Sequence, residues 1–246
     1  MRLLLRILEE SVNVALEAFG KVNIFVGKNN SGKSSILEAL CIIKSALTNE
    51  IFGESMLRLL LYRRGIERTS YTVREFWHNY ETDKNIKFYL KFREEEPVSV
   101  EIKWQTDNLI EISFSKADAK FTCYPRIDSV GRGTSSGKIE DILREETITY
   151  LQRLMLIDDQ LARKLEKHET RVFGRILESR LDKKIAIELK KAYGVNAEGL
   201  SYIPFSPGIL GKTKLAVVTP KLSIHIDDIG DGAKYTTVIL SLALLL

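Results

Sequence analysis

The 246-residue sequence predicts an α/β fold that combines a mixed β-sheet, an antiparallel β arm and a helical subdomain. Three observations lead to this prediction. A short β-branched run, residues 22–26, passes through a glycine-rich loop into a segment of helical periodicity. Apolar and polar residues then alternate between residues 86 and 124. Residues 139–194 return to helical spacing and contain no proline. We expect one domain over residues 1–246.

The composition is that of a folded protein with a sizeable core, because 44% of the residues are apolar and 28% are charged. The net charge of +4 permits contact with nucleic acid but does not argue for it. Cys41 and Cys123 are too few for a disulfide framework or a zinc site, so we expect both to be buried in a cytoplasmic protein. The sequence has no apolar run of about 18 residues, so we expect no contact with a membrane.

The elements follow in a definite order. Residues 1–47 predict a strand, a turn at Gly20, a second strand, a glycine loop and a helix, and residues 56–64 add a helical patch. The β arm, residues 84–125, holds three alternating segments at 86–92, 98–104 and 109–114. A helical subdomain covers residues 139–195 and stops at Gly194. Residues 213–246 predict strands at 214–219 and 221–226, followed by a long apolar helix from Tyr235 to Leu246.

The glycine loop carries the chemistry. Residues 27–34 match G-x-x-x-x-G-K-[ST], the phosphate-cradling P-loop, and they stand between a predicted strand and a predicted helix. In that setting backbone N–H groups point at phosphates, Lys33 reaches the β- and γ-phosphates, and the Ser34 hydroxyl binds Mg²⁺. The alternative is a glycine-rich turn that matches by chance. The sequence therefore predicts ATP and Mg²⁺ bound by Gly27, Lys28, Asn29, Asn30, Ser31, Gly32, Lys33, Ser34 and Ser35.

A second glycine-rich stretch, residues 131–138, has a similar composition. Gly133 is one position too close to Gly137-Lys138 for a P-loop, and no strand precedes the stretch. We interpret it as a surface loop.

An aspartate- and glycine-rich segment, residues 226–234, opens the long apolar helix of the C-terminal part. A helix N-terminus preceded by glycines offers bare backbone N–H groups and would be a second anion-binding site. The alternative is an Asp/Gly turn that caps a core helix, which the same residues would serve equally well.

With these motifs in this order, the chain resembles the ABC-type ATPase heads of the RecF, SMC and overcoming-lysogenization-defect group, including stand-alone AAA-family ATP-binding proteins. The resemblance rests on "FVGKNNSGKSSILEAL" and "IDDIGDGAKYTTVILSLALL" and covers the chain in order of elements. It implies a P-loop NTPase fold of ABC-ATPase type and ATP hydrolysis, in which Lys33 is the catalytic residue.

The resemblance also implies an assembly. It makes Gly230, Asp231 and Gly232 part of a signature segment, residues 230–234, that caps the γ-phosphate held by a second subunit. The implied partners are a second copy of the chain, in a homodimer closed over ATP, and DNA or an effector protein or domain. Gly230 stands where many members have serine, which removes a hydroxyl contact but not a backbone contact.

The family's acidic metal site, an apolar strand ending in Asp-Glu, would follow the signature helix. The sequence reaches Leu246 before such a strand, so we expect this chain to be an N-terminal portion of the complete protein. Asp158-Asp159 and Asp227-Asp228 follow apolar runs and are weaker matches to this site. The family's water-positioning glutamine stays open among Gln105, Gln152 and Gln160.

Two other classes of function were weighed. A non-catalytic nucleotide-binding or assembly module is consistent with the missing acidic strand. A P-loop kinase or GTPase is disfavoured, because we find no lid or acceptor site and no Asn-Lys-x-Asp motif for base recognition. His78, His168 and His225 lack metal-ligand spacing, so we assign them no catalytic role.

Overall fold

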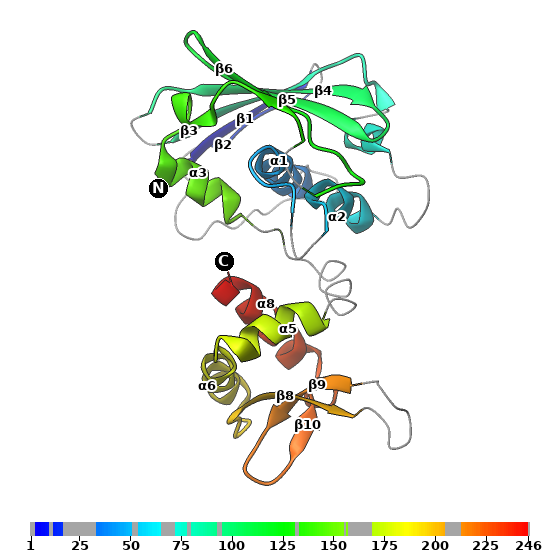
Figure 1. Cartoon of the computed structure of the whole chain (residues 1–246), viewed down its shortest axis with the longest axis vertical. Coiled ribbons are helices and arrows are strands. Elements are labelled where there is room, and N and C mark those ends of the chain that lie inside the picture. Colours follow the sequence, from blue (N-terminus) through cyan, green and yellow to red (C-terminus); the bar gives the residue numbers. More distant parts are fainter. Residues whose placement is uncertain are drawn as a thin grey trace. The chain divides into compact units, whose positions relative to one another are not determined.

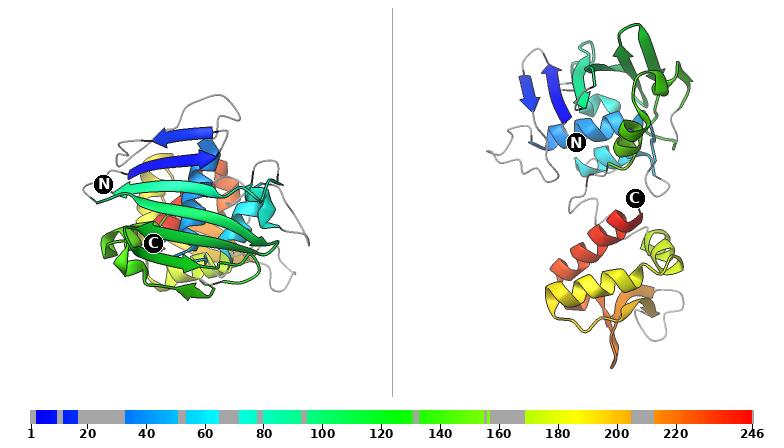
Figure 2. Two further views of the ribbon diagram at one scale, coloured as in Figure 1. Left: turned by 90° about the horizontal axis from the view of Figure 1, so that it is seen from above. Right: turned by 90° about the vertical axis from the view of Figure 1, so that its left-hand side faces the viewer.

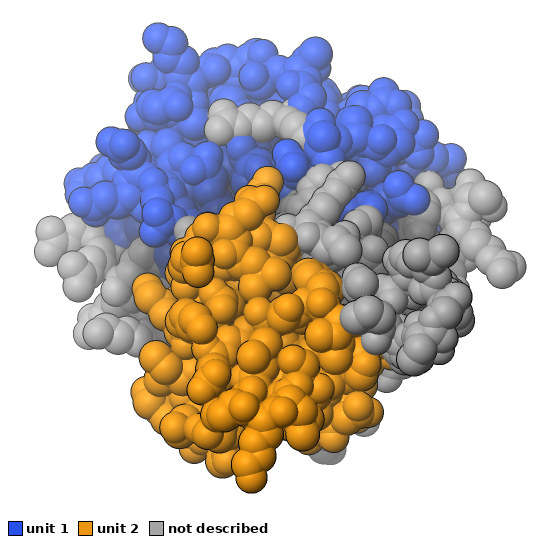
Figure 3. Space-filling view, turned by 60° about the horizontal axis from the view of Figure 1, so that its bottom comes forward, with its two compact units in different colours: residues 1–156 blue, residues 157–246 orange. Residues whose placement is uncertain are grey.

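A computed structural model describes residues 3–9, 12–16, 33–50, 54–64, 72–77, 80–92, 95–130, 133–154, 156, 169–204 and 213–245. The chain divides into two compact units, Met1–Leu156 (unit 1) and Ile157–Leu246 (unit 2), coloured separately in Figure 3. The single domain expected over residues 1–246 stays a prediction. The fold class is α/β, with helices packed on antiparallel sheets.

Unit 1 is built on a seven-stranded sheet in the order β2-β1-β3-β4-β5-β6-β7. Its strands are β1 (Leu3–Glu9), β2 (Val12–Leu16), β3 (Ile86–Phe92), β4 (Val98–Thr106), β5 (Leu109–Lys116), β6 (Ala119–Cys123) and β7 (Ser135–Ser136). Each neighbouring pair is antiparallel. The mixed sheet that we expected is therefore not found among the strands that the structure describes.

The core of unit 1 lies between this sheet and the helices beneath it (Figure 1). Because side chains alternate along a strand, β3 buries every second residue, and its inner side chains lie opposite those of β4 in the pair Phe88–Val100. Helices α1 (Lys33–Ser45), α2 (Met56–Arg63) and α3 (Glu145–Gln152) and the short 3-10 helices η1 (Val73–Phe76) and η3 (Ile139–Asp141) complete the unit. The buried residues Ile43, Leu57 and Leu61 come from α1 and α2.

Most elements of unit 1 confirm the sequence prediction. The first strand, the helix after the glycine loop, the helical patch and the three alternating strands lie at the expected positions. The first hairpin differs, because β1 and β2 pair from Glu9–Val12 onward and turn well before Gly20. The strand expected at residues 22–26 lies outside the described residues. Ser135 and Ser136 of the expected surface loop add a short edge strand against β6.

Unit 2 packs helices on a three-stranded antiparallel sheet in the order β10-β9-β8 (Figure 1). Its strands are β8 (Gly199–Pro204), β9 (Thr213–Val218) and β10 (Ser223–His225). Its described helices are α5 (Glu169–Glu178), α6 (Asp182–Tyr193), α7 (Ile226–Ile229) and α8 (Asp231–Leu245). Figure 2 shows α6 lying beside α8. As predicted, α6 ends at Gly194, which takes the left-handed conformation with φ +68°.

Helix α8 is on average the most apolar of the longer described helices, and its 15 residues are fewer than a bilayer span requires. Across the described part of the chain, no helix is long and apolar enough to cross a membrane.

Candidate functional site

Helix α1 begins at Lys33, directly after the glycine loop, and runs for 13 residues. It forms because Ile36, Leu40 and Ile43 recur on one face and are all buried. Residues 27–32 of the predicted P-loop and the side chain of Lys33 lie outside the described residues. The structure therefore describes, from Lys33 onward, the helix that would receive the phosphates.

The first turn of α1 suits an anion. It contains no acidic residue, and the Ser34 and Ser35 side chains are exposed. A helix N-terminus presents unpaired N–H groups with a partial positive charge, and an acidic side chain there would compete with a phosphate for them. The described start of α1 therefore fits a bound phosphate.

The same turn fits Mg²⁺ as a second ligand. Mg²⁺ prefers hard oxygen ligands and is usually held by one or two protein groups together with phosphate oxygens and water. The Ser34 hydroxyl is one exposed oxygen of this kind, next to the N–H groups that would hold the phosphates. When bound, the ion would neutralise part of the phosphate charge.

An ion pair fixes α1 against α2 one turn further on. Glu38 is 4% exposed and accepts hydrogen bonds from Arg64 Nε at 3.1 Å and from Arg64 Nη2. Arg64 caps the C-terminus of α2, donates through Nη1 to the carbonyl of Glu75, and places its guanidinium 5.4 Å from the centre of the Phe76 ring. One arginine thus joins three elements, α1, α2 and η1.

A second set of contacts fixes the other end of α1. Asn49 is fully buried and donates to the carbonyls of Arg126 at 2.7 Å and Ser129 at 3.1 Å. Its Oδ1 accepts hydrogen bonds from Ser55 Oγ and from the Leu57 backbone N–H at the start of α2. These hydrogen bonds satisfy the buried polar atoms of Asn49 and tie it both to the start of α2 and to the segment after β6.

Gly230, Asp231 and Gly232 lie in unit 2 at the start of α8. Gly230 has φ +114° and ψ 160°, a conformation that only glycine adopts readily, and its carbonyl accepts the Lys234 N–H. Gly232 packs under Tyr193, since an added Cβ would come within 3.3 Å of the tyrosine hydroxyl. The backbone conformation of Gly230 and the packing of Gly232 therefore each explain why glycine stands there without a phosphate contact. This is what the alternative of an Asp/Gly turn that caps a core helix predicts. Their contact with a phosphate stays a prediction.

Two lysines form ion pairs with Asp227, which lies in α7 shortly before Gly230. Lys234 Nζ and Lys214 Nζ each lie 2.9 Å from a carboxylate oxygen of Asp227. Hydrogen bonds from Lys234 and then Lys214 lower the pKa of the Asp227 carboxyl. These contacts join α7, β9 and α8, so they fix the direction in which α8 leaves the turn.

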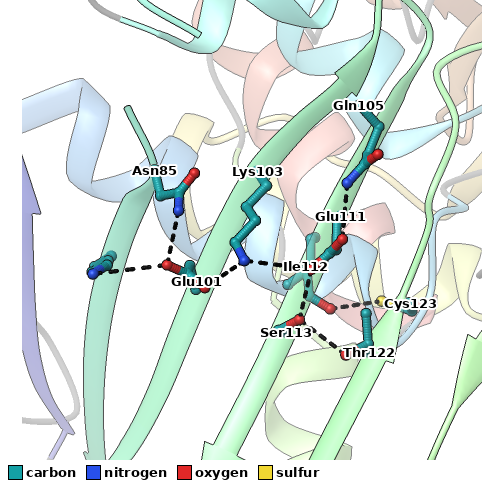
Figure 4. A network of polar contacts seen from close by, with 10 residues as sticks. Asn85, Glu101, Lys103, Gln105, Glu111, Ile112, Ser113, Thr122 and Cys123 are labelled. Carbon is teal, nitrogen blue, oxygen red and sulfur yellow. Dashed lines mark hydrogen bonds and ion pairs between the residues drawn. The ribbon is translucent and has the colours of Figure 1, made fainter. Parts of the chain in front are cut away.

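The other residues weighed from the sequence are scattered. Asp158, Asp159 and Gln160 lie outside the described residues, whereas Asp227 and Asp228 belong to α7 rather than to the end of a strand. Gln105 donates to Glu111 at 2.8 Å within a polar network on the sheet (Figure 4). Gln152 is the last residue of α3. Two residues later, the Leu154 carbonyl accepts a hydrogen bond from Lys44 in the last turn of α1. Within the described ranges, no group of three or more His, Cys, Asp or Glu could hold a metal ion.

Sequence reasoning missed Glu38, Arg64 and Lys44. Glu38 carries a weak signal, because it is an acid directly between apolar residues of a helix that must bury one side. Arg64 follows 26 residues later, after another helix, so no local pattern pairs the two.

The P-loop motif at residues 27–34 and the helix α1 that follows it are typical of the class of P-loop NTPases. A family model for the AAA ATPase domain matches residues 6–196 of the 246. The chain belongs to this family, and it therefore carries an ATP-binding module of ATPase type. The match begins in β1 and ends just after α6, so it extends across the boundary between unit 1 and unit 2.

A curated protein is also similar to part of the chain. The uncharacterized protein MJECL10 of Methanocaldococcus jannaschii is 34% identical over 90 residues. The match covers 36% of this chain and 39% of that protein. The chain thus matches well under half of its relative's length.

Proposed function

We propose that the chain is an ATPase head that binds ATP and Mg²⁺ at residues 27–35 and works as part of a dimer. The observation that supports this most directly is the start of α1. The helix begins at Lys33, carries no acid in its first turn and exposes Ser34 and Ser35. Backbone N–H groups of the loop and helix would hold the phosphates, Lys33 would contact the β- and γ-phosphates, and Ser34 would bind Mg²⁺.

Dimerisation over ATP is the second part of the proposal. In an ABC-type head the signature segment of one subunit caps the γ-phosphate on the other, and residues 230–232 would do this with backbone N–H groups at the start of α8. The exposed Asp231 and Gly232 leave that helix end accessible within unit 2. Hydrolysis would then separate the subunits and drive a cytoplasmic effector protein or a transaction on DNA.

The experiment that tests the proposal is a binding measurement with a Lys33→Ala variant. Calorimetric titration with ATP and Mg²⁺ should show binding to the wild-type chain and none to the variant, because the charge that contacts the phosphates is gone. Thermal unfolding without nucleotide serves as the folding control. Unchanged ATP affinity in a folded variant would refute the site.

ATP turnover separates the ATPase from the non-catalytic binding module. The measurement is made on this chain with ATP and Mg²⁺, and turnover above that of the Lys33→Ala variant would favour the ATPase. Gel filtration with and without ATP tests the dimer. ATP binding without turnover would favour the module.

A further inference from the structure

Helix α6 of unit 2 carries its lysines on one exposed side. These lysines are Lys183, Lys184, Lys190 and Lys191. At about 3.6 residues per turn, all four lie within about 60° of Ile187 around the helix axis. Ile187 is 53% exposed, and the four lysines are exposed as well. The opposite side of the helix is buried, with Ile185, Ala186 and Leu189 facing the core of unit 2. We call the exposed side, with its four lysines and Ile187, the lysine face.

The positive charge of the lysine face is only partly neutralised. Helix α6 has two acids, of which Asp182 is buried and Glu188 is exposed and pairs with Lys191 at 2.7 Å. Lys183 donates to the backbone carbonyl of Glu198 rather than to a carboxylate. Among the residues that the structure describes, Lys184 and Lys190 have no acidic partner. The net charge of the chain does not by itself argue for a polyanion as a partner, but lysines gathered on one helix face do.

The spacing of the lysines suits the two edges of a DNA groove. Lys183 and Lys184 stand about seven residues, or about 10 Å along the helix, from Lys190 and Lys191. The major groove of B-form DNA is about 12 Å wide and admits an α-helix. Lysine side chains are long and flexible, so the two pairs can contact phosphates on both sides of the groove at once. The deep, narrow major groove of a double-stranded RNA does not offer this arrangement.

Other anionic partners fit the lysine face less well. Single-stranded nucleic acid is usually held by aromatic side chains that stack on its bases, and none stands between the lysines of α6. Binding in a membrane surface needs an apolar helix side, and that side of α6 is already packed in unit 2. The cores of protein–protein interfaces are depleted in lysine. A second copy of the same face would be repelled by its charge.

We propose that the lysine face of α6 docks on the phosphate backbone of double-stranded DNA without reading its sequence. The inference rests on the proposed function for DNA as a partner, and it names the surface that makes the contact. In the right-hand view of Figure 2, α6 lies on the near side of unit 2, where a rod-shaped ligand could approach it. The alternative is a solvated helix face that binds nothing.

The salt dependence of binding tests the proposal. Each lysine that contacts a phosphate releases a counterion, so the logarithm of the association constant falls linearly with the logarithm of the salt concentration. Fluorescence anisotropy with a labelled DNA duplex of arbitrary sequence gives this slope between about 50 and 200 mM salt. The double variant Lys184→Gln/Lys190→Gln should make the slope shallower by about two and weaken binding at least about tenfold at the lowest salt. Neither substitution breaks an ion pair that the structure describes, and thermal unfolding monitors the fold.

A matched control removes the same charge elsewhere. Lys91 and Lys120 are exposed on β3 and β6 of unit 1, so Lys91→Gln/Lys120→Gln lowers the net charge equally and should leave the slope unchanged. Glu188→Gln should act in the opposite direction. It releases Lys191 from its ion pair, so the slope should steepen by about one and DNA should bind more tightly.

Four results would overturn the proposal. They are no binding of the duplex by the wild type at low salt, equal effects of the two double variants, equally tight binding of a single strand or an RNA duplex of the same length, and displacement of the DNA by phosphatidylserine vesicles. All titrations are made without ATP, and calorimetry with ATP and Mg²⁺ is run separately on the wild type. If the chain binds ATP but not the duplex, this inference fails alone. If it binds the duplex through α6 but not ATP, the proposed nucleotide site fails alone.

Discussion

Lys44 Nζ donates a hydrogen bond of 2.6 Å to the backbone carbonyl of Leu154, 110 residues further along the chain. Lys44 lies in the last turn of α1, where a cation interacts favourably with the helix dipole, and it is only 2% exposed. Leu154 follows α3 near the end of unit 1. The bond therefore fixes the segment after α3 to the helix that begins the proposed nucleotide site.

Replacing Lys44 by Met should remove a pH-dependent part of the stability. Burial lowers the pKa of Lys44 below its ordinary 10.5, so the unfolded chain binds this proton more tightly than the folded chain. Stability from this group is therefore smallest below the lowered pKa and rises as the pH increases towards 10.5. Urea unfolding of both proteins from neutral pH upward checks this. A stability difference that does not change with pH would contradict it.

Replacing Gly230 by Ala should destabilise the fold by about 1–3 kcal/mol, the usual cost of a side chain in a conformation reserved for glycine. The expected loss of stability comes from backbone strain alone, because a Cβ at Gly230 would meet no atom within 4 Å. Gly174→Ala is the control. Gly174 lies inside α5 with equally open space around it, so alanine there should raise stability by up to about 1 kcal/mol. Chemical unfolding measures both, and equal effects would refute the argument.

Replacing Gly232 by Ala separates the two explanations for this glycine. The new methyl would lie 3.3 Å from the Tyr193 hydroxyl, so the variant should lose stability. Tyr193→Phe removes that oxygen, together with its 2.7 Å hydrogen bond to Thr236, and should recover part of the loss when combined with Gly232→Ala. Thermal unfolding checks the packing explanation. If ATP-dependent dimerisation stays defective in a double variant that folds normally, Gly232 is also needed for close approach to phosphate.

The elements that could be predicted are those whose cause is local. Alternation in residues 86–92 gives β3 at those residues, because every second side chain faces the helices. The start of α1 follows from the glycine loop and the apolar residues after it, and the end of α6 follows from Gly194. These features need no knowledge of a distant partner.

The remaining features depend on tertiary contacts. β8 was not predicted, because Gly199 and Pro204 at its ends are typical of loops, and pairing with β9 keeps it extended. The family resemblance treats Gly230 as a replacement for serine. Its φ of +114° shows that the backbone itself requires glycine there, which cannot be deduced from the sequence pattern. The contact of Arg64 with Glu38 could not be predicted from the sequence either, because the two residues meet only when α1 and α2 pack together.

The position of β1 in the sheet has a consequence for synthesis of the chain. Leu5 pairs with Leu16 on one side and with Leu90 on the other, so one neighbour forms at once and the second comes more than 80 residues later. At ribosomal speeds of about 5–20 residues per second, the open edge of β1 waits on the order of ten seconds for β3. The helix α1 is made during this interval, and its apolar face stays uncovered until β3 closes the sheet. A nascent chain of this protein is therefore exposed to aggregation or chaperone binding before it can bind nucleotide.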